Sequence, residues 1–154
     1  MPIYCILDLC CLTYLYNVHL LSKKNVFLIS LSSIGLLYII AEALNIFVFN
    51  ELDVKTFQPY MKIVVNFVVI IYALYFIYEK INSYNDYKFK GFGLNASILI
   101  TYTLTTLFFL PYNYFVNAKT LLKFIVPAFH VLIVSSYYFY ITVLIWRNGR
   151  IRKH

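Results

Sequence analysis

Few residues of this chain could do chemistry, and the clearest is one acidic residue inside an apolar stretch. Glu42 lies within residues 28–49, a run long enough to cross a bilayer as a helix, which needs about 20 apolar residues. A carboxylate is costly at membrane depth, so it normally faces other helices or water. Asn45 follows on the same helical face. We therefore expect Glu42 to face the interior of a helical bundle.

Other apolar stretches carry polar residues at a comparable depth. Asp8, Asn66 and His130 each lie about 10–14 Å from the end of their predicted helix, at 1.5 Å of rise per residue. Thr105 lies slightly deeper. We therefore expect Glu42 to lie within reach of His130, Asp8 or Asn66. The predicted intramembrane polar layer consists of Asp8, Glu42, Asn45, Asn66, Thr105 and His130.

This polar layer has two interpretations. Hydrogen bonds between membrane helices average about 0.6 kcal/mol, so the layer could serve only to fix helix packing. Asp8 could in that case reach water or pair with the nearby α-amino group. Alternatively, two carboxylates and one imidazole at one depth could share protons or bind a small cation. Pro127, one turn before His130, favours a kinked helix there because it frees the carbonyl of Lys123.

The composition indicates which elements position these residues. The chain has 154 residues, of which 62% are hydrophobic and 12% charged, whereas a soluble domain is about 45–50% apolar and about 25% charged. The sequence therefore predicts an integral membrane protein that forms one transmembrane domain over residues 1–154. The predicted fold is an all-α transmembrane bundle of about five spans. These spans are expected at about 2–21, 26–49, 59–81, 93–110 and 121–146, with loops at 82–92 and 112–120.

The basic residues predict the orientation of these spans. Five spans place the two termini on opposite sides, and most of the 13 Lys and Arg residues fall on the side of the C-terminus. Because Lys and Arg gather on the cytoplasmic side, the N-terminus is expected outside and the C-terminus inside. Lys62 counts among the few basic residues of the outer side. The basic tail 147–154 predicts either a topology anchor or contact with anionic lipid through Arg147, Arg150, Arg152 and Lys153.

Signatures of catalysis and cofactor binding are missing from the sequence. It contains no P-loop, no GxGxxG and no HExxH motif. The three cysteines, Cys5, Cys10 and Cys11, share one apolar stretch without a CxxC pair. We therefore expect them to serve only as small apolar side chains in helix packing. We therefore predict no catalytic residue, no metal and no cofactor. The net charge of +7 is ascribed to topology, and no nucleic acid is expected as a partner.

Three local patterns carry a resemblance to known proteins. They are an acidic residue late in a helix (residues 40–43), an aromatic helix ending in Glu79-Lys80, and a histidine early in the last helix at Phe129-His130. In these patterns, residues 30–148 resemble small multi-span integral membrane proteins of bacteria with AT-rich genomes. The resemblance implies a bacterial inner membrane (plasma membrane) location and implies no particular activity.

Two functions remain open at this point. Short loops and the missing catalytic set favour a non-enzymatic subunit that binds other membrane proteins, senses the membrane or assembles as a homo-oligomer. The polar layer around Glu42 and His130 favours a subunit of a small ion, proton or solute transporter or channel. Such a small bundle would then work as an oligomer.

Overall fold

The computed structural model describes residues 2–49, 59–82, 91–117 and 121–150, and this part of the chain is helical with short connections. The first two helices each end in a π-helical turn, η1 and η2. The elements in chain order are α1 (Pro2–Leu15), η1 (Tyr16–Leu20), α2 (Val26–Leu44), η2 (Asn45–Phe49), α3 (Tyr60–Asn82), α4 (Phe92–Phe109), α5 (Tyr112–Asn117) and α6 (Leu122–Arg150).

Five helical segments are long and apolar enough to cross a membrane, which confirms the predicted fold class at this level. The candidate spans are Pro2–Leu20, Val26–Val48, Tyr60–Asn82, Phe92–Phe109 and Phe124–Arg147. Asn25 begins the second of them, because its side-chain oxygen accepts a hydrogen bond from the Phe27 N–H at 2.9 Å.

Two boundaries differ from the sequence prediction. Residues 112–117, predicted as part of a loop, form the short helix α5. Pro111 explains this, because it ends α4 and its carbonyl oxygen accepts the first hydrogen bond of the next helix from Phe115 N–H at 3.1 Å. The last helix continues to Arg150, past the predicted end at 146.

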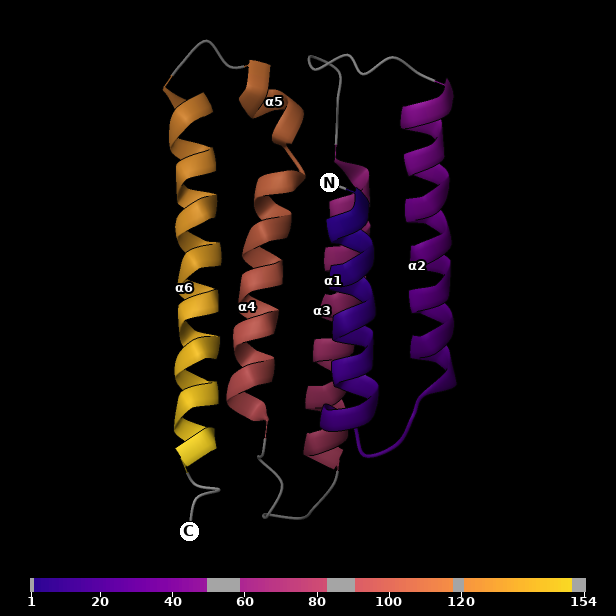
Figure 1. Ribbon diagram of the computed structural model, residues 1–154, viewed down its shortest axis with the longest axis vertical. Helices are drawn as coiled ribbons and strands as arrows, with labels where there is room; N and C mark the ends of the chain where they lie inside the picture. Colours follow the sequence, from indigo (N-terminus) through magenta and orange to yellow (C-terminus); the bar gives the residue numbers. More distant parts are fainter. Residues whose placement is uncertain (1, 50–58, 83–90, 118–120, 151–154) are drawn as a thin grey trace.

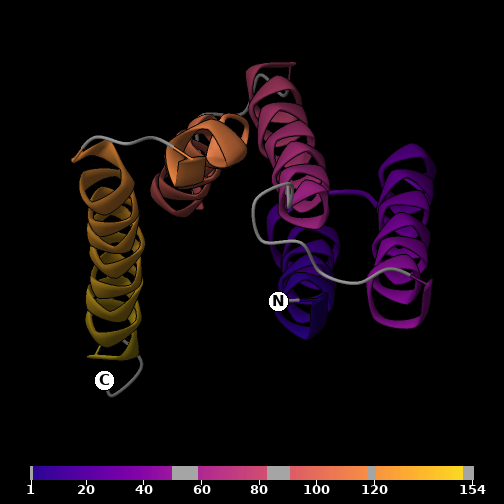
Figure 2. The same cartoon turned by 90° about the horizontal axis from the view of Figure 1, so that it is seen from above.

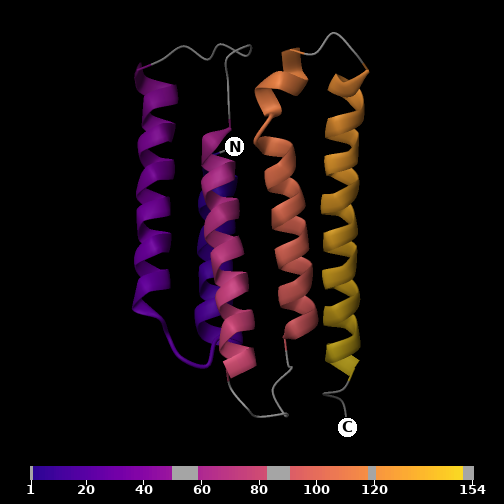
Figure 3. The same cartoon turned by 180° about the vertical axis from the view of Figure 1, so that it is seen from behind.

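The long helices run side by side in alternating directions, so α1 begins and α6 ends at opposite ends of the bundle (Figure 1). The view from behind shows the same order of helices (Figure 3). Seen from above, α3 and α4 stand between α6 on one side and α1 and α2 on the other (Figure 2). α3 packs on α1, α2 and α4, whereas α6 packs on α4 and α5. The core therefore lies around α3.

A glycine lets α2 approach the centre of this core. A Cβ atom placed on Gly35 would lie 3.3 Å from Val68 of α3 and 3.6 Å from Leu9 of α1. Gly35 is buried, and so is Ile39 one turn later. The buried face of α2 then continues to the half-buried Glu42.

Neutral hydrogen bonds join the helices near the end of α1. The Tyr72 hydroxyl oxygen accepts a hydrogen bond from Asn17 Nδ2 at 3.1 Å and lies 3.0 Å from Ser32 Oγ. The Tyr16 hydroxyl donates to Asn95 Oδ1 at 2.7 Å, and Asn95 Nδ2 donates to the carbonyl oxygen of residue 73 at 3.2 Å. These five residues, Tyr16, Asn17, Ser32, Tyr72 and Asn95, are called the tyrosine network below.

Candidate functional site

The most polar interior site of the described chain is an ion pair between α1 and α3. Lys62 Nζ lies 2.7 Å from Asp8 Oδ2, and their side chains are only 8% and 13% exposed. Lys62 lies in the first turn of α3, and its long aliphatic stem lets the ammonium group reach away from the helix end. Asp8 thus pairs with a lysine of another helix, while the α-amino group of residue 1 lies outside the described residues.

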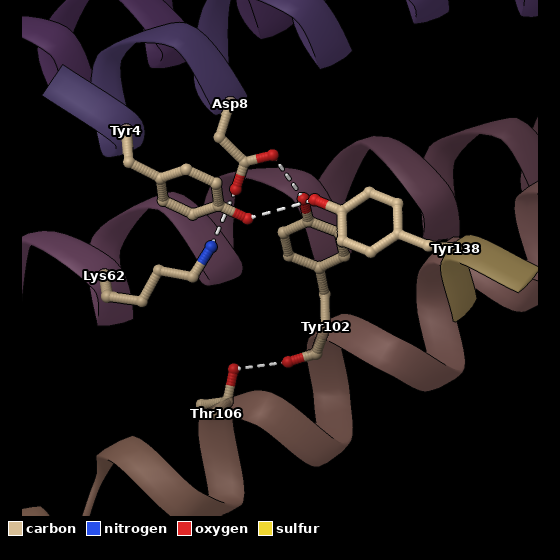
Figure 4. Close-up of polar contacts among 6 residues, drawn as sticks. All are labelled: Tyr4, Asp8, Lys62, Tyr102, Thr106 and Tyr138. Atoms are coloured by element: carbon tan, nitrogen blue, oxygen red, sulfur yellow. Dashed lines mark hydrogen bonds and ion pairs between the residues drawn. The ribbon is translucent and has the colours of Figure 1, made fainter. Parts of the chain in front are cut away.

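A tyrosine of α4 completes the partners of this carboxylate. The Tyr102 hydroxyl donates a hydrogen bond to Asp8 Oδ1 at 2.6 Å (Figure 4). Both carboxylate oxygens therefore have a partner, and α1, α3 and α4 meet at one point. Asp8, Lys62 and Tyr102 are called the ion-pair centre below. Removing one member of a buried ion pair typically costs about 3–5 kcal/mol, because it leaves an uncompensated charge.

Aromatic rings surround the lysine. Lys62 Nζ lies 4.9 Å from the centroid of the Tyr4 ring and 5.2 Å from that of Tyr102, distances at which a ring face attracts a cation. The Tyr4 hydroxyl also lies 3.5 Å from the Tyr138 hydroxyl, which links α1 to α6 (Figure 4). The positive charge of Lys62 is thus balanced by one carboxylate and two rings.

A cavity of about 200 Å³ lies beside the ion-pair centre, between α1, α3, α4 and α6. Its lining includes side chains with ammonium, hydroxyl or imidazole groups, although most of the surface they present to the cavity is apolar. The lining residues with a polar group are Tyr4, Lys62, Thr101, Tyr102, Thr105, His130, Tyr137 and Tyr138. A water molecule takes about 30 Å³ in the liquid, so a cavity of this size can hold several waters or one small solute.

His130 forms one wall of this cavity. Its ring packs edge-on against Phe109 at 5.1 Å and Phe108 at 6.2 Å between centroids. Its Nε2 atom is buried and has no hydrogen-bond partner within the described residues. His130 also borders a second cavity, of about 210 Å³, next to Pro127. The imidazole therefore stands between two cavities of similar size.

The structure brings some members of the predicted polar layer together. Thr105 and His130 line the same cavity. Asp8 accepts hydrogen bonds from two other residues that line this cavity, Lys62 and Tyr102. Asn66 is fully buried on α3, one turn after Lys62, and neither polar atom of its side chain has a partner in the described part of the chain.

The other members of the predicted layer lie elsewhere. The Glu42 carboxylate is in hydrogen-bonding contact with the Tyr38 side chain and the Met61 backbone, and it does not line the cavity beside the ion-pair centre. Met61 is in the first turn of α3, where backbone N–H groups lack partners within the helix and favour a carboxylate. Glu42 therefore lies beside the first turn of α3, and its buried Oε2 atom has no hydrogen-bond partner among the described residues. Asn45 is exposed at the start of η2.

Lys62 and its aromatic neighbours Tyr4, Tyr102 and Tyr138 were missed by reasoning from the sequence. Lys62 was counted as a topology signal because it closely follows Pro59. A signal was present nonetheless: Lys62 is a basic residue inside an apolar run, and an acidic residue of another apolar run needed a partner. The tyrosines gave no such signal in a chain with 16 of them.

Metal and lipid sites are less well defined. The residues that the structure describes contain no group of three His, Cys, Asp or Glu side chains placed to hold a metal ion. Of the predicted lipid-contacting residues, Arg147 is exposed on α6 and Arg150 is the last residue of that helix. Arg152 and Lys153 lie outside the described residues.

Comparisons with models of protein families, with curated proteins and with solved structures found no match for this chain. The fold and the site together define a protein that is all-α over its described residues, with five candidate membrane spans and a buried ion pair beside a cavity. Any function has to be argued from that site.

Proposed function

We propose that this chain is an integral membrane protein that binds a small polar solute or ion in the cavity beside the ion-pair centre, as a transporter or channel subunit. The observation that carries the proposal is the cavity of about 200 Å³ beside the buried Lys62–Asp8 ion pair, whose lining includes Lys62, Tyr102 and His130. Ammonium, hydroxyl and imidazole groups of such side chains can form hydrogen bonds to a small polar solute.

The arrangement of the helices supports lateral access to the cavity. Its walls come from α1, α3, α4 and α6, and α1 and α6 are not among the closely packed helix pairs of the described chain. A long contact of 3.5 Å between the Tyr4 and Tyr138 hydroxyls joins these two helices. In this proposal, a solute enters past that contact.

Filling the cavity tests this proposal. Thr105→Trp places a large ring into the cavity, whereas Thr103→Trp adds the same ring to an exposed position of the same helix. The probes are radiolabelled chloride, acetate, glycerol and rubidium, added to the protein in nanodiscs. We expect at least one of them to bind. Thr105→Trp should abolish that binding and Thr103→Trp should preserve it. Equal binding by the two variants, or no bound probe at all, would contradict the proposal.

A non-enzymatic assembly subunit is the second candidate, and one observation favours it. The candidate span of α6 has no buried residue within the described chain, and Phe139 at its middle is 73% exposed. Another membrane protein or a second copy could cover this face. Native mass spectrometry should then show an oligomer that Phe139→Ala weakens and Phe67→Ala, at an exposed site of α3, leaves intact. A strictly monomeric protein without partners would rule this candidate out.

We also propose an orientation with the N-terminus outside and the C-terminus inside a bacterial inner membrane, with the basic tail against anionic headgroups. The excess of Lys and Arg on the side of the C-terminus supports this. A green fluorescent protein fused to the C-terminus should fluoresce in cells, and an alkaline phosphatase fused there should stay inactive. The opposite pair of results would reverse the orientation.

A further inference from the structure

We infer that the solute of this cavity is a small anion with a single negative charge, which binds Lys62 Nζ on the side away from Asp8. This inference rests on the proposed function of the same cavity and names the class of its ligand.

The ion pair is oriented with respect to the cavity. Lys62 and Tyr102 line the cavity, whereas Asp8, which contacts both, is not among the lining residues. Lys62 is therefore part of the cavity wall, whereas the Asp8 carboxylate is not. An ammonium group has three N–H donors, and one of them is directed at Asp8 at 2.7 Å. In our inference, one of the other two donors binds the anion.

The rest of the lining offers some hydrogen-bond donors within a mainly apolar surface. Four lining residues carry a hydroxyl group, Thr101, Thr105, Tyr137 and Tyr138, and none of the described residues that line the cavity carries a carboxylate. Hydroxyl groups can donate to an anion. A cation would lie closest to the ammonium group and find no opposite charge, so this lining disfavours the small cation that the sequence suggested.

The charge and the size of the cavity limit the anion further. An anion bound to Lys62 Nζ on the side away from Asp8 would lie nearer to the positive end of the ion pair than to its negative end, and the Coulomb energy falls with distance. Attraction therefore exceeds repulsion, but only one cation, Lys62, is present to balance the ligand. A volume of about 200 Å³ suits chloride or acetate with a few waters at about 30 Å³ each.

Equilibrium binding to the full-length protein in nanodiscs tests the charge of the ligand. The probes are labelled chloride and acetate as anions, glycerol as a neutral solute and rubidium as a cation. We expect an anion to bind and the other two classes to show no saturable binding. Asp8→Asn removes the competing carboxylate and should tighten anion binding by about tenfold.

Removal of the lysine should have the opposite effect. The double variant Asp8→Asn with Lys62→Met leaves no unpaired buried charge, so we expect it to fold. We expect it to weaken anion binding by about 10- to 100-fold relative to the unaltered protein, as the loss of a charge-assisted hydrogen bond predicts. Lys24→Met, at an exposed lysine before α2, is the matched control and should leave binding unchanged.

Each outcome separates this inference from the proposed function. One outcome is that glycerol or rubidium binds, that Thr105→Trp abolishes this binding, and that no anion binds. The cavity is then a solute site and the anion inference is wrong. Anion binding that the double variant retains also overturns the inference. If none of the probes binds, both the inference and the proposed function fail.

Discussion

The ion-pair centre and the tyrosine network both connect α3 and α4 to the first helical segment, but they do so with different chemistry. The tyrosine network uses neutral groups and also reaches α2 through Ser32, and Asn95 and Tyr72 within it are 0% and 1% exposed. The ion-pair centre uses two charges and borders a cavity that Lys62 and Tyr102 line. The comparison shows that one bundle contains both neutral and charged contacts between helices. We propose that the charges serve ligand binding.

The largest expected effect comes from breaking the ion pair on one side. Lys62→Met leaves the Asp8 carboxylate buried without its countercharge, so the free energy of unfolding should fall by about 3–5 kcal/mol. Unfolding in mixed detergent and SDS, followed by circular dichroism, measures this change. The double variant with Asp8→Asn should recover most of the loss. A double variant as unstable as Lys62→Met would show that the charges are not coupled.

Tyr102→Phe should have the next largest effect. It removes the 2.6 Å hydrogen bond to the Asp8 carboxylate, and hydrogen bonds to charged groups contribute about 1.5–3 kcal/mol. The same unfolding assay should show a loss of stability in this range. No measurable loss would mean that water replaces the hydroxyl from the cavity side.

Tyr16→Phe sharpens the comparison from the side of the tyrosine network. It removes the 2.7 Å hydrogen bond to the fully buried Asn95, so stability should fall by about 1–2 kcal/mol. Neither Tyr16 nor Asn95 lines the cavity, so solute binding per folded protein should stay unchanged. A loss of binding would mean that the tyrosine network stabilises the cavity in its binding form.

The smallest effect is expected for Tyr138→Phe. Its hydroxyl makes a long contact of 3.5 Å with Tyr4 at an exposed position, so the free energy of unfolding should change by less than about 0.5 kcal/mol. A destabilisation as large as that of Tyr102→Phe would show that α6 is held to α1 more firmly than the geometry indicates.

The sequence predicted the helices better than the contacts between them. Long apolar runs set the five spans by their length alone, and Pro111 marked the break before α5. Thr105 and His130, selected by depth, do line one cavity. Depth along a helix is therefore informative even when the neighbours of that helix are unknown.

The partners of the acidic residues could not be predicted from the sequence, for two physical reasons. Depth was counted from each helix end, but the long side chain of Lys62 carries its charge away from the start of α3 to reach Asp8. Depth also says nothing about which helix a residue faces. Glu42 lies beside the first turn of α3, where the Met61 backbone satisfies part of its carboxylate.

Chemical accessibility of two buried positions tests the central claim most directly. In a background with Cys5→Ala, Cys10→Ser and Cys11→Ser, Thr105→Cys places a thiol in the cavity and Ala73→Cys places one at the tyrosine network; the parent residues are 4% and 0% exposed. We expect a small hydrophilic methanethiosulfonate to label Thr105→Cys in nanodiscs and to leave Ala73→Cys unlabelled. Equal labelling of the two thiols, or no labelling of Thr105→Cys, would contradict the claim that the ion-pair centre borders a solute site.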